Sequence, residues 1–454
     1  MQRFVRTFVA AWSAALIGAP NRAGAQSLEH SATPPPSKTP DARVEAQGLE
    51  HELRIDTVLE IAERANPEIR EAQERVRSAA ARASSAGRLP DLEAKYEQWG
   101  VPLARPYALN EAATLMLGLR QTIPAPGVLG ARSRSAGGEA RMQAEAARAR
   151  QQDVRQRVKR AFYDYYRTSR EYRIHLEHVE LESHIIELAR QNYQVGRATQ
   201  QDVLRAIVDH SRLHSDVADL IQQLDSSKAL LNTLMARPVD APLGPPAEIN
   251  PAQVPVGDAP AQNTVPESRP EIASAKLGIE RSEATLDAAN TEARLPSIMV
   301  GADYWYQPAS PVQHAYGAMV SINLPWLTGR HGDQIREAEH ALAADIHAFE
   351  SARNAALFDV RDARARLKAA QQSFRIMDGD LLPQARQSFE AAQAAFAAGK
   401  GDALGLLDSA RSYLQVRIEH ARALARLGSS SADLERALGA DLTGAAPAAQ
   451  EKHQ

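Results

Sequence analysis

Apolar residues recur with helical spacing over two long stretches of the chain, residues 139–236 and residues 332–438. The first stretch is interrupted once, at Gly196, and the second once, at Gly399. Each stretch therefore predicts two long helices that turn back on each other at the glycine. A helix from 139 to 195 would be about 85 Å long at 1.5 Å per residue, which is far longer than the helices of an ordinary globular domain.

A different pattern, alternation with a period of two, precedes each of these stretches. Residues 90–125 and 296–326 are each predicted to form a β-hairpin, and the helical segments 55–88 and 270–294 come before them. The residues expected to share one face are Leu92, Ala94, Tyr96, Leu115, Leu117, Leu119, Gln121 and Ile123 in the first hairpin, and Ile298, Val300, Ala302, Tyr304, Tyr316, Ala318, Val320, Ile322 and Leu324 in the second.

The same order of elements occurs twice because the chain is duplicated. Pro-Glu-Ile at 67–69 recurs at 270–272, and Arg-Leu-Pro at 88–90 recurs at 294–296. Two further pairs are the hydrophobic-Pro steps at 123–124 and 324–325 and the aromatic-x-x-Gly steps at 193–196 and 396–399. The four offsets are 203, 206, 201 and 203 residues, so the repeat is a half-protein rather than a solenoid unit of about 20–50 residues.

The predicted domains follow from this duplication. The first repeat spans 55–236 with its helical hairpin at 139–236, and the second spans 267–439 with its helical hairpin at 332–438. The remaining segments are a signal peptide at 1–25, a Pro-rich leader at 26–54, a linker at 237–266 with eight prolines, and a disordered tail at 440–454. Arg3 and Arg6, a short apolar run and the small residues at 23–25 support export with cleavage.

Composition narrows the classes of protein. Only 5% of the 454 residues are aromatic and the net charge is -3, which favours long helices and gives no support for a nucleic-acid partner. The chain has no cysteine, so disulfides, cysteine-based metal or redox chemistry and an N-terminal lipid anchor are not expected. No motif of an enzyme occurs, and neither catalysis nor a cofactor is predicted.

Four strands in one chain imply a membrane barrel built from several chains. Each strand is close to the 9–11 residues that a tilted strand needs to cross a bilayer, and membrane strands must close into a barrel. Outer-membrane barrels begin at about eight strands, so three chains, which supply twelve strands, would suffice. The aromatic residues expected at the membrane interfaces are Tyr96, Trp99, Tyr304, Trp305, Tyr306 and Trp326. The alternative is a soluble coiled-coil protein with two hairpins.

The landmarks are similar to those of the TolC-type outer-membrane efflux proteins over almost all of the mature chain. They are the Asn/Arg-Pro-Glu-Ile starts at 66–69 and 269–272, the two Arg-Leu-Pro steps, the two hydrophobic-Pro exits, and the two aromatic-x-x-Gly turns followed by Asp or Leu. The resemblance implies a mainly α protein with a membrane β-barrel portion. It implies a homotrimer in the bacterial outer membrane, with a twelve-stranded barrel in contact with lipid and a long α-helical barrel in the periplasm.

The resemblance also implies a function, a passive exit duct that docks on a periplasmic adaptor (membrane fusion protein) and an inner-membrane pump. Residues 121–127 resemble the subgroup that works with heavy-metal efflux pumps, so metal cations are the expected cargo. A multidrug or type I secretion duct of the same fold is the first alternative. A periplasmic adaptor or a structural coiled-coil protein of the envelope is the alternative from a different class.

Three carboxylates near the glycine turns are the candidate pore residues, Asp202, Asp402 and Asp408. In a trimer each would form a ring of three, and crowded carboxylates select for cations and are blocked by them. The resemblance implies that Asp408 matches an aspartate of the periplasmic constriction and Asp202 a tip aspartate. The other interpretation is N-capping or surface charge, with Asp402 as the strongest cap candidate. Asp408 lies nine residues after Gly399, and the residue nine positions after Gly196 in the first repeat is Arg205.

The turns themselves are expected to contact the adaptor through Gly196, Arg197, Gly399 and Lys400. Each glycine ends a long helix, where a left-handed cap favours glycine.

Two histidine pairs have the spacing of metal ligands on a helix, His175 with His178 and His210 with His214. The favoured interpretation is that all four are exposed histidines on long solvated helices, and no metal site is predicted.

Overall fold

The computed structural model describes residues 49–101, 104, 112–196, 198–254, 267, 269–308, 310–327, 329–398 and 400–442. The predicted signal peptide and most of the leader lie outside these residues, as do 255–266 of the linker and 443–454 of the tail. Among the site residues, Arg197 and Gly399 also lie outside the described part of the chain.

The two repeats share the order helix, β-hairpin, long helical hairpin. The first repeat has α3 (Ile55–Ala65), α4 (Pro67–Ala86), β1 (Glu93–Trp99), β2 (Thr114–Ile123), α5 (Val128–Gln194) and α6 (Gln200–Leu234). The second has α7 (Pro270–Arg294), β3 (Ile298–Tyr306), β4 (His314–Ile322), α8 (Arg330–Ile376), the π-helical turn η4 (Met377–Leu381), α9 (Leu382–Ala397) and α10 (Ala403–Leu438). Short 3-10 turns, η2 (Pro251–Gln253) and η3 (Pro325–Leu327), lie in the connections. The mainly α fold with a small sheet is confirmed.

The segment 55–88, predicted as one helix, is two helices because the chain breaks at Asn66. Pro67 has no N–H to continue the first helix and instead starts the second. The Asn66 side chain accepts a hydrogen bond from the Glu68 N–H (2.9 Å) and donates one to the Leu234 carbonyl (2.9 Å). The break is therefore a capped joint that fixes α4 to the end of α6.

Helix α5 begins at Val128, well before the predicted start at residue 139. The glycines near its start misled the prediction, since glycine usually weakens a helix. Gly138 is needed for packing, because a Cβ there would lie 3.1 Å from the Cβ of Arg281 on α7. Gly127 has a φ of 93° and allows the sharp turn from β2 into the helix. The second long helix, predicted at 332–398, is interrupted by η4 just before Pro383.

The four strands form one antiparallel sheet in the order β1-β2-β3-β4. Strand β2 of the first repeat pairs with β3 of the second, with Leu117 opposite Tyr304 and Ile123 opposite Ile298. This pairing joins the two repeats, and it leaves β1 and β4 as the edges of the sheet. Neither edge pairs with another strand among the described residues.

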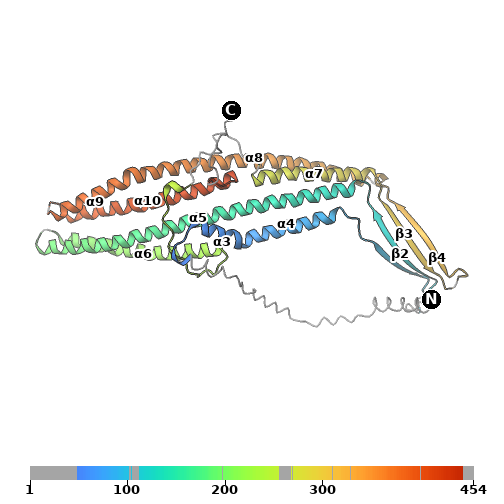
Figure 1. The fold of residues 1–454 in the computed structure, drawn as a ribbon, viewed down its shortest axis with the longest axis horizontal. Helices are drawn as coiled ribbons and strands as arrows, with labels where there is room; N and C mark the ends of the chain where they lie inside the picture. Colours follow the sequence, from blue (N-terminus) through green and yellow to red (C-terminus); the bar gives the residue numbers. More distant parts are fainter. Residues whose placement is uncertain are drawn as a thin grey trace, which may run out of the picture. The chain divides into compact units, whose positions relative to one another are not determined.

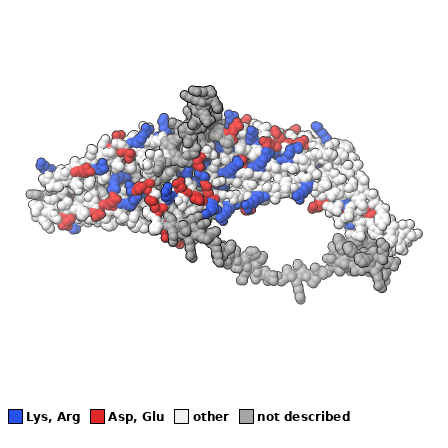
Figure 2. All heavy atoms as spheres, viewed as in Figure 1, with Lys and Arg blue, Asp and Glu red and all other residues white. Residues whose placement is uncertain are grey.

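The two faces of the sheet differ in polarity. One face exposes apolar side chains from all four strands, and the predicted sharing of a face is confirmed by the register. Its exposed members include Tyr96, Leu117, Leu119, Ile123, Ile298, Val300, Tyr316, Val320 and Ile322. The opposite face carries charged pairs, Lys95 with Glu97 and Arg120 with Asp303 (4.0 Å). In Figure 2 few charged atoms lie over the strands, whereas both signs are interspersed along the helices.

Helix α5 is the centre of the helical packing. It contacts α4, α6, α7 and α10, and α8 in turn contacts α7 and α10 (Figure 1). The main core lies between α3, α5 and the end of α6, and a second core lies between α8 and α10. Among the described helices, none has the length and apolar character required to cross a membrane.

The described parts of the predicted leader, linker and tail belong to this packing. Leu49 and Leu53 of the leader are buried in the main core. The linker residue Gly244 donates its N–H to the Leu49 carbonyl (2.8 Å) and accepts a hydrogen bond from the Tyr165 hydroxyl (2.8 Å). Asp441 of the tail pairs with Arg155 (2.6 Å). Pro245 of the linker accepts a hydrogen bond from the Leu53 N–H (2.9 Å), and Pro246 forms a parallel bridge with Leu53.

Candidate functional site at the hairpin turns

The turn between α5 and α6 depends on Gly196, which follows the C-cap residue Val195. This glycine has a φ of 72° and donates its N–H to the Tyr193 carbonyl (3.0 Å). An added Cβ would meet no atom within 4 Å. The requirement for glycine is therefore conformational, since a left-handed backbone is costly for other residues.

The turn between α9 and α10 begins at the C-cap residue Ala398 and ends at the N-cap residue Asp402. Lys400 and Gly401 both donate their backbone N–H groups to the Ala395 carbonyl, at 2.9 and 3.1 Å. These bonds satisfy a carbonyl at the end of α9 that would otherwise lack a partner. The Lys400 side chain is exposed.

Two of the three candidate aspartates are helix caps. Asp402 accepts a hydrogen bond from the Gly405 N–H (2.8 Å) and is the N-cap of α10. Asp202 forms a capping box with Thr199, accepting from the Thr199 N–H and hydroxyl at 2.8 Å each. The backbone hydrogen bond from Thr199, supported by its hydroxyl, lowers the pKa of Asp202. Both carboxylates are therefore held at the starts of the returning helices.

Asp408, unlike Asp202 and Asp402, does not cap a helix. Its side chain is 59% exposed, and its Oδ1 lies 3.5 Å from Nη1 of Arg411 on the same helix. Asp402 is exposed as well, but one of its oxygens is engaged by the cap, whereas the Asp408 carboxylate faces solvent beside Arg411.

The structure adds a buried ion pair that sequence reasoning missed. Asp209 on α6 is only 6% exposed and pairs with Arg411 on α10. This pair joins the helical hairpin of the first repeat to that of the second, close to the two turns. Because Arg411 also lies next to Asp408, it connects the joint between the hairpins to the candidate pore carboxylate.

Two further titratable groups are buried on α5 beside this joint. His178 and Glu182 are 4% and 2% exposed, and His178 Nε2 lies 3.6 Å from Glu182 Oε1, too far for a hydrogen bond. Burial raises the pKa of Glu182 to about 7, partly opposed by Arg411. Burial, together with His175, lowers the pKa of His178 to about 4. His175 is buried as well, so the predicted exposure of this histidine pair is wrong.

Away from the turns, ion pairs continue to tie α10 to α5. Glu171 is 2% exposed and accepts from Arg422 Nε (2.8 Å) and Arg167 Nη1 (2.9 Å). Burial alone would raise the pKa of Glu171, but the hydrogen bonds from Arg422 and Arg167 outweigh it and hold this pKa below its usual value. The carboxylate is therefore ionised and acts as a fixed link between the helices.

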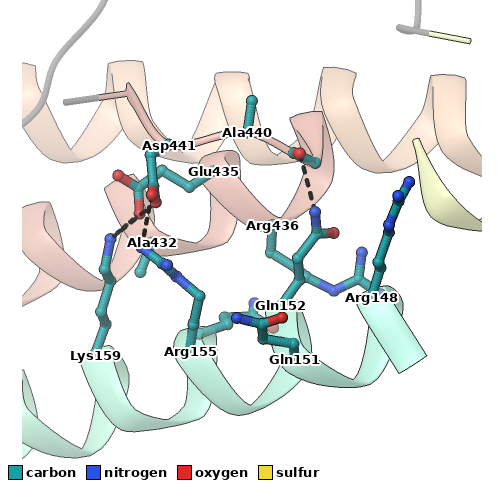
Figure 3. A pocket seen from close by; sticks show the side chains of 12 residues that line it. Arg148, Gln151, Gln152, Arg155, Lys159, Ala432, Glu435, Arg436, Ala440 and Asp441 are labelled. Carbon is teal, nitrogen blue, oxygen red and sulfur yellow. Dashed lines mark hydrogen bonds and ion pairs between the residues drawn. The ribbon is translucent and has the colours of Figure 1, made fainter. Parts of the chain in front are cut away.

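A pocket of about 230 Å³ lies between α5 and the end of α10 (Figure 3). Gln152 donates to the Gly439 carbonyl (2.9 Å), Lys159 pairs with Glu435, and Arg155 pairs with Asp441. Because its cations face carboxylates of the same chain, the pocket is a joint between helices and offers no free charge for a ligand.

One protein-family profile matches the chain twice, once in each repeat. Residues 58–237 and 263–440 match the profile described as "Outer membrane efflux protein", and together they cover more than half of the sequence. The chain belongs to the outer membrane efflux protein family. The resemblance drawn from the sequence landmarks is thus confirmed at the level of the family.

Solved structures show the same fold as this outer membrane efflux protein. A membrane protein from Pseudomonas aeruginosa is 18% identical with a TM-score of 0.72, covering 88% of this chain and 93% of its own. CusC, described with "transmembrane channel formation", is 18% identical with a TM-score of 0.75, covering 86% and 93%. VceC from Vibrio cholerae is 17% identical with a TM-score of 0.69, covering 86% and 96%. A search of curated proteins gave no match.

Proposed function

We propose that three copies of this chain form an outer-membrane channel that acts as the passive exit duct of a tripartite efflux system. The observation that carries this proposal is the sheet. It exposes an apolar face, carries polar side chains on the other face, and has two edges, β1 and β4, that no strand of the described residues covers. A membrane excludes open edges, whereas edge pairing between copies closes a barrel with an apolar exterior and a polar interior.

The helical part supports the same assembly. Apolar side chains that the single chain leaves exposed include Phe358 on α8, which is 69% exposed, and Ile346 and Ile376 on the same helix. These side chains are spread along α8, and its surface there is open to a neighbouring copy. We propose that neighbouring copies cover it when the helices close into the periplasmic barrel.

The hairpin turns are proposed to dock on a periplasmic adaptor that connects the duct to an inner-membrane pump. Near the first turn, Tyr193, Val195 and Leu204 are exposed. The turns themselves are shaped by Gly196 and by the caps Asp202 and Asp402. An adaptor protein is a less suitable interpretation of this chain, because the chain has two helical hairpins and belongs to the efflux protein family.

Heavy-metal cations are proposed as the cargo, with the exposed carboxylate of Asp408 as a ring at the narrow end of the duct. Such a ring attracts cations. In the structure, residues 121–127, which carry the resemblance to the metal subgroup, form the end of β2 and its connection to α5. The Gln121 side chain donates to the Pro90 carbonyl (2.8 Å), and Gly127 allows the turn. Their role is therefore local, and Asp408 gives the stronger support for cation cargo.

Two measurements test these proposals separately. Outer-membrane fractions should contain the chain as a detergent-extracted trimer that conducts ions in planar bilayers, and solubility without detergent would refute the channel. A deletion strain should be more sensitive to copper, zinc, cobalt, cadmium or silver than to hydrophobic drugs. Hypersensitivity to dyes and detergents alone would instead assign the duct to the multidrug branch.

A further inference from the structure

His210 and His214 stand one turn apart on α6 with their ring nitrogens converging. Their Nε2 atoms lie 3.2 Å apart, and the rings are perpendicular at a centroid distance of 4.6 Å. His214 is exposed, and His210 is half-buried. His210 Nδ1 is buried without a hydrogen-bond partner in the described structure, so the polar contact of this ring is made through Nε2.

This separation matches two ligands of one metal ion. Imidazole nitrogens bind Zn²⁺ at about 2.0–2.1 Å, so two of them lie about 3.3 Å apart at a tetrahedral angle and about 2.9 Å apart at a right angle. The observed distance falls between these values. We propose that His210 and His214 form a two-ligand site for a divalent transition-metal ion on the surface of α6, with water completing the coordination.

The chemistry of the pair predicts its selectivity. Imidazole suits copper, nickel and zinc, and affinity rises toward Cu²⁺ along the first-row series. Mg²⁺ and Ca²⁺ prefer oxygen ligands and should not bind.

The same surroundings predict weak, exchangeable binding. Among the described residues no group of three or more His, Cys, Asp or Glu side chains converges as a metal site, so the protein supplies two ligands. A ligating histidine usually donates its other ring N–H to an acceptor, and losing such a partner costs about 10- to 100-fold in affinity. His210 lacks one.

The other histidine pair lacks these features. His175 Nδ1 is 2.8 Å from the Glu171 carbonyl, and His178 Nε2 faces Glu182 in the buried joint. Of these two pairs, the one on α6 presents two convergent nitrogens with access from solvent. This site does not depend on which cargo passes through the duct, since it rests on the geometry of α6 alone.

The test uses the untagged mature chain in detergent, with Cu²⁺ or Zn²⁺ as the probe. Calorimetric titration should give one ion per chain, and the electron paramagnetic resonance spectrum of bound Cu²⁺ should show two nitrogen ligands. His210→Asn or His214→Asn should each weaken binding at least about tenfold, because a lost ligand should cost no less than a lost outer partner. His347→Asn, on α8, is the matched control and should leave binding unchanged.

A second measurement locates the ion on the helix. A metal ion that links two turns stabilises the folded form to which it binds. Amide hydrogen exchange over residues 207–218 should therefore slow on addition of Cu²⁺ in the wild type and not in His214→Asn. Equal affinity in all three variants, a single nitrogen ligand, or unchanged exchange over 207–218 would each overturn the site. None of these outcomes affects the channel, which the trimer and conductance measurements test.

Discussion

Replacing Glu182 with glutamine should make the protein more stable at alkaline pH than the wild type. Glu182 is buried beside His178 and near Arg411, and its pKa is raised from 4.5 to about 7. In the unfolded chain the carboxyl ionises near pH 4.5, whereas in the folded chain it stays protonated until about pH 7. The wild type therefore loses stability as the pH rises through this window.

The magnitude follows from the two pKa values. Each pKa unit corresponds to about 1.4 kcal/mol, so the full loss is about 3 kcal/mol per chain above pH 7. Glutamine has nearly the same shape and cannot ionise, so Glu182→Gln lacks this loss. The stability difference between variant and wild type should widen in favour of the variant by about 2–3 kcal/mol between pH 5 and pH 8.

Urea denaturation of the detergent-solubilised protein, followed by aromatic fluorescence at fixed protein concentration, measures this difference. Glu180→Gln is the matched control, because Glu180 lies on the same helix and is exposed. The difference in the free energy of unfolding between Glu180→Gln and the wild type should not change with pH. A constant offset between Glu182→Gln and the wild type from pH 5 to pH 8 would refute the reasoning, since it would mean that the buried carboxyl ionises without cost.

Three further predictions concern the same end of the helices. Arg411→Met should destabilise the protein by about 2–3 kcal/mol in denaturation experiments, because it removes the closer of the two arginine partners of the buried Asp209 carboxylate and leaves Arg212 at 3.9 Å. Arg411 itself is 35% exposed, so the cost should fall below the 3–5 kcal/mol of a fully buried pair. Adding Asp209→Asn to this variant should recover most of the loss, and an additive further loss would contradict the pairing. Gly196→Val should leave the trimer intact on gels but abolish resistance in cells. Valine at this left-handed position costs about 1–2 kcal/mol and reshapes the turn. Full resistance would show that the turn is not a docking element. Asp408→Ala should reduce block of the channel by multivalent cations and lower its cation preference in planar bilayers. Asp402→Ala should instead cost about 1 kcal/mol of stability through the lost cap. Unchanged block in Asp408→Ala would show that this carboxylate does not line the constriction.

The fold could be predicted because its elements are long and its hydrophobic pattern is duplicated. The alternation in 298–304 and 316–322 specified which residues share the exposed apolar face, and the register confirms it. Helix boundaries were less accurate where glycine and proline have a packing role. Gly138 lies inside α5 because α7 approaches closely there, and Asn66 breaks a helix because its side chain caps the next one.

The buried polar joint was missed for a physical reason. On a long helix a charged residue is usually solvated, so His178, Glu182 and Asp209 were given no structural role. A signal was present, since His178 and Glu182 continue the spacing of the buried stripe between Ile174 and Ile185. The partner helix α10 comes from the other repeat, and a single-helix pattern contains no information about which helix covers it.

The capping roles of Asp202 and Asp402 could be predicted from their position after a turn, whereas a pore role depends on neighbours that one chain does not contain. Local hydrogen bonds determine the capping roles, whereas the assembly of several copies determines whether a carboxylate lines a pore. The central claim therefore concerns the assembly, and it can be tested without removing any native cysteine, because the chain has none.

The most direct measurement is cysteine cross-linking between β1 of one copy and β4 of the next in outer membranes. One cysteine replaces Tyr96 on β1, and a second is placed in turn at Tyr316, Ala318 or Val320 on β4. Within one chain β1 and β4 are separated by two strands, about 14 Å at 4.8 Å per strand, which exceeds the reach of a disulfide. The proposed barrel predicts cross-linked dimers and trimers on denaturing gels for at least one register. The absence of any cross-linked species at every register would contradict it.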